Sequence, residues 1–155
     1  MLTSENDVYA AGDVCTVGWD VAPRWFQMRL WTQARIMGIY SAHCIACHLE
    51  NSSPLIYSNF DIFTHVTKFF GFKVILLGLF NGQKLNNDYE VLLRVTPKQE
   101  YIKVVMKDGK MQGAILIGET DYEETFENLI INQIDLSQYG DDLLNSSIDI
   151  DDYFD

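Results

Sequence analysis

The chain has 155 residues, of which 48% are hydrophobic, and it carries a formal net charge of −11 at pH 7. A chain of this length and composition can bury one sizeable core, so we expect a folded globular protein. The negative charge argues against binding to nucleic acid or to an anionic membrane surface, because both need basic side chains facing phosphate groups.

The cellular compartment is indicated by the first residues and by the cysteines. Met1 is followed by polar residues rather than by a basic segment and an apolar core, so we expect no signal peptide. The longest apolar run, residues 74–80, is too short to cross a bilayer. Three cysteines make no paired disulfide framework, which suits a reducing interior. We therefore expect an intracellular protein of the cytoplasm, with the nucleus as an open alternative.

The first predicted element is a short buried strand at residues 8–11, which ends in the turn Gly12-Asp13. Glycine allows the backbone to come close to a ligand, and a carboxylate can accept hydrogen bonds from sugar-alcohol hydroxyls. A strand that ends in such a turn, followed by the start of a helix, indicates a site for a polar cofactor.

A helix of about five or six turns is predicted to begin near residue 29, because apolar residues recur there at helical spacing. Its first turn offers unpaired N–H groups and a partial positive charge to an anion or a carbonyl oxygen. Trp31 fits either a core position or a contact with a bound ring. We expect one apolar face made of Leu30, Ala34, Met37, Ser41, Ile45 and Leu49, backed by Trp31, Gly38 and Ala42, with Gln33 and Arg35 facing outward.

The segments Val8-Tyr-Ala-Ala-Gly-Asp13 and Leu30-Trp-Thr-Gln-Ala-Arg-Ile-Met-Gly38 resemble the second flavin-binding motif of the pyridine nucleotide-disulfide oxidoreductase superfamily. This resemblance implies FAD as the cofactor. Gly12 and Asp13 would form the turn whose carboxylate holds the ribityl chain. The backbone of Arg29, Leu30 and Trp31 would face the flavin ring. A later run, residues 63–74, extends the resemblance over the chain, as the C-terminal portion of such a protein.

The resemblance also implies how the chain is divided. Residues 1–50 correspond to the C-terminal segment of the FAD-binding domain, residues 55–140 to an α+β C-terminal domain, and residues 141–155 to an acidic tail. The Gly-x-Gly-x-x-Gly turns that mark the family's dinucleotide sites do not occur in this sequence. We therefore expect a fragment or short isoform that binds FAD weakly or not at all by itself, since such a turn normally holds the pyrophosphate.

The sequence Cys44-Ile-Ala-Cys47-His48 lies in the last part of the predicted helix. It matches the pattern of c-type haem attachment, but that chemistry usually takes place in an exported, oxidising setting. A redox dithiol is favoured at a helix start, where the dipole lowers the pKa of a thiol, and this pair lies near a helix end. A zinc site would need these residues together with His43 and a further ligand such as Cys15 or His65. We favour structural thiols and predict no metal site.

Beyond a linker at residues 51–54, apolar residues alternate with polar ones as in strands. We expect strands at residues 60–67, 73–79, 89–95, 101–107 and 111–117, with Ile102, Val104 and Met106 facing inward and Lys103 and Lys107 outward. Asp108-Gly109 predicts a two-residue type I′ hairpin turn between the last two strands.

A second helix is expected after Thr120-Asp-Tyr-Glu123, which has the pattern of a capping box. Its face of Tyr122, Phe126, Leu129 and Ile130 would pack on the antiparallel sheet. The predicted fold class is therefore α+β: the remnant of a flavin-binding strand-turn-helix, followed by a C-terminal antiparallel sheet with a packed helix. In the family that this chain resembles, such a C-terminal domain commonly shields the flavin or pairs subunits.

The last stretch of the chain is acidic and contains no Lys or Arg. It is either a solvated tail or a segment that docks on a partner, because Ile148, Ile150, Tyr153 and Phe154 alternate with its aspartates. The aspartates are Asp135, Asp141, Asp142, Asp149, Asp151, Asp152 and Asp155.

Two functions follow from these patterns. The first is part of an FAD-dependent oxidoreductase that uses NAD(P)H to reduce an unidentified acceptor in redox homeostasis, where the cofactor performs the chemistry. The second is a non-catalytic module for protein interaction or subunit pairing. We predict no catalytic acid, base or nucleophile in this chain; His65 is the best polar candidate, and a histidine at the end of a strand is usually structural.

Overall fold

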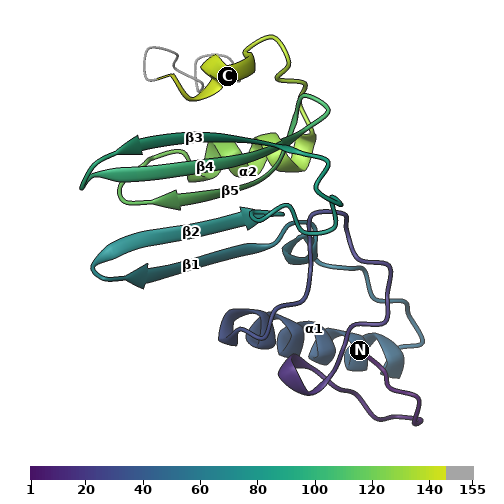
Figure 1. Ribbon diagram of the computed structural model, residues 1–155. Helices are drawn as coiled ribbons and strands as arrows, with labels where there is room; N and C mark the ends of the chain where they lie inside the picture. Colours follow the sequence, from purple (N-terminus) through teal and green to yellow (C-terminus); the bar gives the residue numbers. More distant parts are fainter. Residues whose placement is uncertain (146–155) are drawn as a thin grey trace. The chain divides into compact units, whose positions relative to one another are not determined.

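The computed structural model describes residues 1–145 and forms two compact units, Met1–Asp61 and Ile62–Asp155 (Figure 1). Each unit has a hydrophobic core of its own. The linker predicted at residues 51–54 lies within the first unit, because Tyr57 and Phe60, which follow it, pack on that unit's core.

The first unit is built on helix α1, Trp31–Leu49, with two short 3-10 turns, η1 at Gly12–Val14 and η2 at Ser58–Phe60. The 19 residues of α1 confirm the predicted length of five to six turns. Aromatic rings form the core beside the helix: the ring of Phe60 lies 5.3 Å from Tyr40 and 5.5 Å from Trp25, both edge to face. Such pairs stabilise a core beyond the area they bury.

The predicted buried face of α1 is correct only for Met37 and Ser41. The residues that the helix buries are Gln33, Met37, Tyr40, Ser41, Cys44 and Cys47, whereas Trp31, Ile45 and Leu49 are exposed. The helix is apolar on both sides, so its periodicity alone could not select one. The side of α1 that carries Tyr40 is the buried one, because the aromatic rings of Trp25 and Phe60 pack there.

The strand predicted at residues 8–11 is also absent from the described part of the chain. Tyr9 forms an isolated antiparallel bridge with Leu2, and Ala10 N–H donates to the carbonyl of Met1 at 3.0 Å. Val8 is half exposed. A buried parallel strand needs neighbouring strands on both sides, and residues 1–61 supply only the short segment at the N-terminus.

The second unit is an antiparallel sheet of five strands in the order β1-β2-β5-β4-β3, with helix α2 against one face (Figure 1). The strands are β1 (Thr64–Phe69), β2 (Phe72–Gly78), β3 (Glu90–Thr96), β4 (Glu100–Lys107) and β5 (Lys110–Ile117), and α2 spans Glu123–Asn132. The α+β class and the five predicted strands are confirmed. The first strand begins later than predicted, because Phe60 belongs to η2.

The main core lies between this sheet and α2. Phe126, Leu129 and Ile130 are fully buried against the sheet, and Tyr122 packs beside them, as the helical spacing predicted. In β4, Ile102, Val104 and Met106 face this core, while Lys103 and Lys107 are only half buried. The alternation predicted for this strand is therefore confirmed.

The predicted capping box is wrong. Helix α2 begins at Glu123 with Tyr122 as its N-cap, so Thr120 lies too early to cap it, and no side chain does so. Glu123 instead pairs with Lys73 of β2. The hydroxyl of Thr120 is buried and has no hydrogen bond among residues 1–145.

The hairpin turn between β4 and β5 has the predicted geometry, with φ of 51° at Asp108 and 71° at Gly109. Two successive positive φ values define a type I′ turn, which favours glycine at the second position. Gly109 also has no room for a side chain, because Ser137 lies against it.

A final 3-10 turn, η3 at Gly140–Leu144, lies at the start of the predicted acidic tail. Its Leu143 and Leu144 are buried in the core of the second unit, whereas Asp141 and Asp142 are exposed, so the leucines anchor the start of that segment. The remainder, residues 146–155, lies outside the described residues. None of the helices in residues 1–145 has the length and apolar character needed to cross a membrane.

Candidate functional site

The turn predicted to bind a cofactor lies directly on helix α1. Gly12 is buried and has φ of +79°, a conformation that favours glycine. A Cβ atom placed on Gly12 would stand 3.2 Å from the Cβ of Ala34, in the first turns of the helix. The turn and the helix start, which are some twenty residues apart in sequence, are therefore neighbours in space.

Asp13 follows in this turn with an exposed side chain. Its backbone carbonyl accepts a hydrogen bond from Nε of Arg29 at 3.4 Å, which links the turn to the residues just before α1. Within residues 1–145 its carboxylate makes no hydrogen bond and no ion pair. Both carboxylate oxygens are therefore available to accept hydrogen bonds from a ligand.

The N-terminus of α1 is uncapped. Its N-cap residue, Leu30, has an extended backbone and cannot donate or accept through its side chain. The first bond of the helix runs from the N–H of Ala34 to the carbonyl of Leu30 at 2.9 Å. The N–H groups of Trp31, Thr32 and Gln33 therefore have no acceptor within the helix, and they contribute its partial positive charge. The indole of Trp31, 77% exposed, stands beside them.

Two glutamines hold the loops around this site, and the sequence patterns assigned neither of them a role. The side chain of Gln27 accepts from the N–H of Val17 at 3.1 Å and donates to the carbonyl of Cys15 at 2.8 Å. It thereby fixes the segment that leaves the Gly12-Asp13 turn.

Gln33 was predicted to face outward, but it is only 7% exposed. Its Oε1 accepts from the N–H of Met28 at 2.7 Å, and its Nε2 donates to the carbonyl of Phe26 at 3.0 Å. The amide of Gln33 thus bonds to two backbone groups of the loop, and it places residues 26–28 against the helix.

A cavity of about 490 Å³ adjoins the turn along the chain. Ala10, two residues before Gly12, and Cys15, two residues after Asp13, both line it. The other lining residues come from the N-terminus and from the loop, namely Met1, Leu2, Thr3, Thr16, Val17, Gly18 and Trp19. Neither Gly12 and Asp13 nor the helix start at residues 29–31 lines this cavity, so it neighbours the turn in sequence but is not formed by the predicted site residues.

The cysteine and histidine cluster of α1 does not converge on one point. Sγ of Cys47 lies 3.6 Å from Nε2 of His43, whereas Nδ1 of His48 pairs with the hydroxyl of Tyr9 at 2.6 Å. All three cysteines of the chain are free thiols, and residues 1–145 contain no group of three or more side chains suited to a metal ion. Beside Cys44, burial raises the pKa of Tyr40 to about 12, and Cys44 adds to that rise.

The other polar candidate, His65, lies in β1, in the second unit. Its Nδ1 is buried and has no hydrogen bond among the described residues. The residues that the structure does bring together are Gly12, Asp13 and Arg29, next to Leu30 and Trp31 at the helix start.

Residues 65–134 match the family described as the C-terminal domain of rubredoxin NAD+ reductase. The crystal structure of NADH:rubredoxin oxidoreductase from Clostridium acetobutylicum is similar in fold over 87% of this chain and 32% of its own chain. The TM-score is 0.58 and the sequence identity is 23%, so this likeness concerns the fold.

The whole chain is 60% identical to pyridine nucleotide-disulfide oxidoreductase domain-containing protein 1 from Pongo abelii, and 61% identical to the protein of that name from Rattus norvegicus. It spans 31% of the length of each of these relatives. With this identity over all its residues, the chain corresponds to part of a protein of the pyridine nucleotide-disulfide oxidoreductase family.

Proposed function

We propose that this chain is part of an FAD-dependent oxidoreductase that uses NAD(P)H to reduce an acceptor in redox homeostasis. One observation carries the proposal: the carboxylate of Asp13 has no protein partner among residues 1–145 and lies in a turn packed against the uncapped start of α1. Unpaired acceptors beside unpaired donors suit a ligand that has both hydroxyl groups and an electron-rich ring.

Each residue of the site has a distinct proposed role. Asp13 accepts hydrogen bonds from the ribityl hydroxyls of FAD, and Gly12 keeps the turn close to the helix. The backbone at Arg29, Leu30 and Trp31 faces the pyrimidine edge of the flavin. There the N–H groups and the helix dipole favour the negative charge that develops on reduction.

Bound FAD supplies hydride and electron transfer, while the protein positions it and tunes its electronics. No side chain of this chain is assigned as a catalytic acid, base or nucleophile. NAD(P)H and the electron acceptor are proposed partners of the whole protein, since the chain spans 31% of its relatives. Free thiols suit a reducing compartment, and we propose the cytoplasm or the nucleus.

The proposal is tested by flavin binding to the whole protein of which this chain is a part, because these 155 residues contain no Gly-x-Gly-x-x-Gly turn and are expected to bind FAD weakly or not at all by themselves. Bound FAD should have quenched fluorescence, because an exposed indole, Trp31, stands at the helix start. Asp13→Asn should raise the dissociation constant about ten- to a hundred-fold, the effect of losing a hydrogen bond to a charged group.

The matched control is Asp20→Asn, which removes the same charge from another exposed aspartate of the first unit. It should leave the affinity unchanged. Equal weakening in both variants would mean a nonspecific charge effect, and an Asp13→Asn variant of the whole protein that binds FAD as tightly as the parent would contradict the proposal for these residues.

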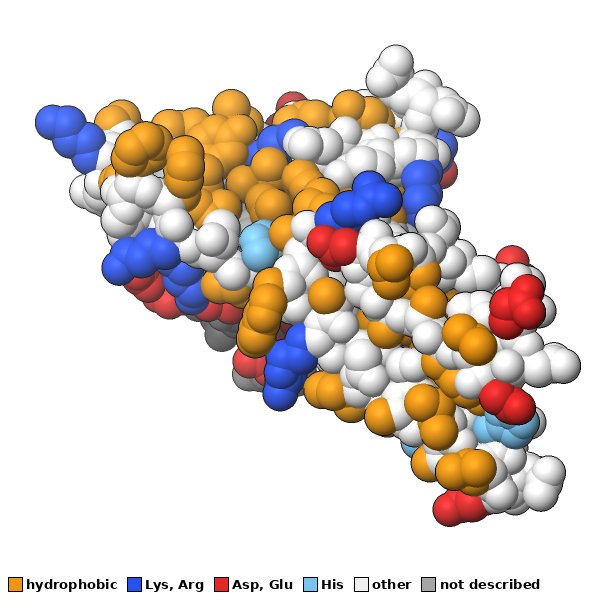
Figure 2. Space-filling model, turned by 90° about the horizontal axis from the view of Figure 1, so that it is seen from below, with side chains coloured by type: hydrophobic (Ala, Val, Ile, Leu, Met, Phe, Trp, Pro, Cys, Tyr) orange, Lys and Arg blue, Asp and Glu red, His pale blue; other side chains and the backbone are white. Residues whose placement is uncertain are grey.

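A second function, a non-catalytic interaction module, is favoured by the turn between β1 and β2. Phe69 and Phe70 are exposed there, Phe70 to 88%, and their rings lie 4.4 Å apart. Hydrophobic side chains are also exposed in broad patches on the face drawn in Figure 2. If this turn pairs subunits, sedimentation velocity should show a dimer that Phe69→Ser with Phe70→Ser converts to a monomer; a parent chain that is monomeric would exclude pairing through this turn.

A further inference from the structure

Residues 9–12 contact helix α1 near both of its ends. Gly12 packs on Ala34, near the start of the helix. The hydroxyl of Tyr9 lies 2.6 Å from Nδ1 of His48, in the last turn. Residues 34 and 48 are about 21 Å apart along a helix that rises about 1.5 Å per residue. The segment that leads into the Gly12-Asp13 turn, together with the side chain of Tyr9, therefore reaches along most of α1.

The Tyr9–His48 contact joins the N-terminal segment to the end of the helix. The N–H of Ala10 donates to the carbonyl of Met1 at 3.0 Å, a bond that lies within the segment and does not attach it to α1. A polar attachment to the helix end comes from the ring of His48, whose other nitrogen, Nε2, lies 3.9 Å from Oδ1 of Asp7. Both ring nitrogens thus face the same segment.

The hydroxyl of Tyr9 can donate to this ring at neutral pH. Its pKa is raised above the ordinary value of a tyrosine, first by desolvation, then by the negative charge of Asp7 and by Cys44. A protonated hydroxyl donates to a neutral imidazole, and it can also accept from Nδ1–H once the imidazole is charged. The Tyr9–His48 contact is therefore compatible with both charge states of the histidine.

A positive charge on His48 strengthens this attachment. A histidine ordinarily changes its charge between about pH 5 and 8. An imidazolium attracts the carboxylate of Asp7, and a cation in the last turn of a helix interacts favourably with the helix dipole. Among residues 1–145, Asp7 and Tyr9 face the ring from the N-terminal segment, while on its own helix Cys44 lies one turn earlier and Glu50 is the C-cap. None of these four groups is a cation that would repel it.

We propose that His48 is a positioning residue for the Gly12-Asp13 turn. Through Tyr9 and Asp7 it holds the preceding segment on α1, and protonation of its ring strengthens that hold. Asp13 lies four residues after Tyr9, so a segment that detaches from the helix end displaces the carboxylate proposed to bind the ribityl chain. The consequence for FAD rests on the proposed function of the turn, whereas the hold itself involves only residues of this chain.

Hydrogen exchange of the 155-residue chain without flavin tests the hold. The reporter is the amide of Ala10, because its bond to Met1 lies within the held segment. Its protection factor, which corrects for the effect of pH on exchange itself, should be about three- to ten-fold higher at about pH 5.5 than at about pH 7.5. A change of this size is expected for a cation that gains a carboxylate partner and a helix C-terminus.

Two variants separate the hydrogen bond from the charge. His48→Asn keeps an oxygen that can accept from Tyr9 but cannot become charged. It should keep the protection of Ala10 at about pH 7.5 and lose the rise at about pH 5.5. His48→Phe loses both interactions, so the protection should fall about three- to ten-fold and should no longer depend on pH. Equal protection at the two pH values in the parent, or a rise that persists in His48→Asn, would overturn the proposal.

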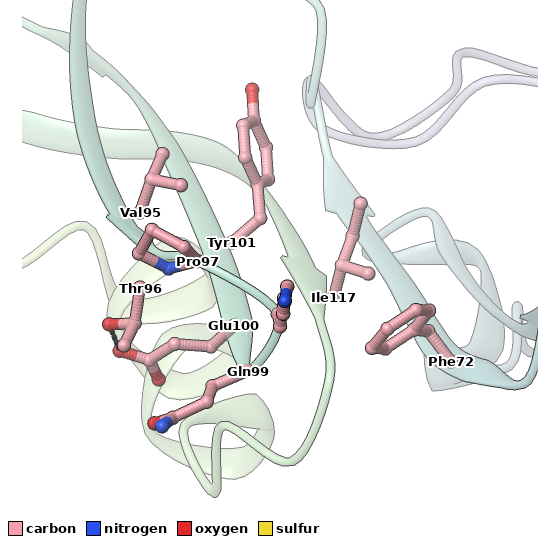
Figure 3. A pocket seen from close by; sticks show the side chains of 9 residues that line it. Phe72, Val95, Thr96, Pro97, Gln99, Glu100, Tyr101 and Ile117 are labelled. Atoms are coloured by element: carbon pink, nitrogen blue, oxygen red, sulfur yellow. Dashed lines mark hydrogen bonds between the residues drawn. The ribbon is translucent and has the colours of Figure 1, made fainter.

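A matched reference amide lies in the second unit, in the turn between β3 and β4 (Figure 3). The N–H of Gln99 donates to the carbonyl of Thr96 at 3.0 Å, the same distance as in the Ala10 bond. The hydroxyl of Thr96 also donates to the carboxylate of Glu100 at 3.0 Å, and none of the described residues that line the shallow pocket of about 190 Å³ there is a histidine (Figure 3). The protection factor of Gln99 should therefore be equal at both pH values. His65→Asn, in β1, should leave the rise at Ala10 intact. A rise at Gln99 equal to that at Ala10 would mean a general effect of pH and would also overturn the proposal.

The consequence for the cofactor is measured separately, in the whole protein of which this chain is a part. At about pH 7.5, His48→Phe should raise the dissociation constant of FAD about three- to ten-fold, and His48→Asn should leave it within about two-fold of the parent. An unchanged constant in His48→Phe would overturn the positioning role. Failure of the proposed function gives a different result, because Asp13→Asn would then bind FAD as tightly as the parent while the His48 variants still alter the protection of Ala10.

Discussion

Gln33 shows what a single polar residue does inside the first unit. A glutamine on an amphipathic helix is ordinarily placed on the solvent side, and the sequence pattern placed Gln33 there. Its burial goes with the loop at residues 26–28, where it accepts from the N–H of Met28 and donates to the carbonyl of Phe26. Local periodicity contains no information about such a loop, so this residue could not be found from the sequence.

Replacing Gln33 by leucine should destabilise the first unit by about 1–3 kcal/mol, because the N–H of Met28 and the carbonyl of Phe26 each lose a partly buried hydrogen bond. Urea unfolding followed by tryptophan fluorescence measures the effect. Thr32→Val, an exposed change in the same helical turn, should stay within about 0.5 kcal/mol of the parent. If the two variants are equally stable, the amide of Gln33 contributes nothing to the loop.

Gly113 of β5 lies against the backbone of Leu79 and Phe80, directly after the end of β2. A Cβ atom there would lie 2.6 Å from the backbone nitrogen of Leu79, which cannot move aside as a side chain could. Gly113→Ala should therefore destabilise the second unit by about 3 kcal/mol, as overpacking does.

The opposite is expected at Gly38 of α1, which has no neighbour within 4 Å. Gly38→Ala should stabilise the first unit by about 0.5–1 kcal/mol. In thermal unfolding, the melting temperature should fall for Gly113→Ala and rise for Gly38→Ala.

At the scale of elements, β2 and α2 are joined by the pair of Lys73 and Glu123. The hydrogen bond from Lys73 lowers the pKa of Glu123 below its usual value. A carboxylate with a lowered pKa stabilises the folded state above the pKa it has in the unfolded chain, and this contribution is lost as the pH falls through the folded pKa.

Glu123→Gln should therefore lower the denaturant midpoint at neutral pH, and the difference from the parent should vanish in strong acid. The measurement is a series of urea titrations from pH 7 to about pH 2, below both carboxyl pKa values. The pair is more than one-third exposed, so the effect should be small and should decrease in high salt. A difference that persists in acid would assign the effect to helix propensity instead.

The strands of the second unit and the buried face of α2 could be predicted from the sequence, whereas the orientation of α1 and the start of α2 could not. Alternation in β4 and the Asp108-Gly109 turn are local signals, and the structure confirms both. The orientation of α1 depends on aromatic rings from distant parts of the sequence that pack around Tyr40. The start of α2 depends on Lys73 of β2, which forms an ion pair with Glu123. The site residues Gly12, Asp13, Arg29, Leu30 and Trp31 came from a family resemblance, and their cofactor role remains a proposal.

For the whole molecule, the arrangement in two units gives a direct spectroscopic separation. All three tryptophans, Trp19, Trp25 and Trp31, belong to the first unit, and the second unit has none. Because each unit has its own core, tryptophan fluorescence should report on the first unit alone, whereas the hydrogen exchange of the strands reports on the second.

Leu129→Ala tests this separation. Leu129 is 1% exposed in the core of the second unit, so its truncation should destabilise that unit by about 2–5 kcal/mol. Strand amides should exchange faster, while the midpoint of the tryptophan transition stays constant. A tryptophan midpoint that moves with this variant would instead show that the chain unfolds in a single cooperative step.

The turn between β1 and β2 has a consequence for engineering. Phe70 adopts φ of 48°, a left-handed conformation that is costly for a bulky residue, and it precedes Gly71 at 87°. Asparagine tolerates this conformation better, so Phe70→Asn should raise the melting temperature while it removes an exposed aromatic ring. One substitution should thus raise the melting temperature and reduce nonspecific association through the exposed ring, provided that no partner binds that ring.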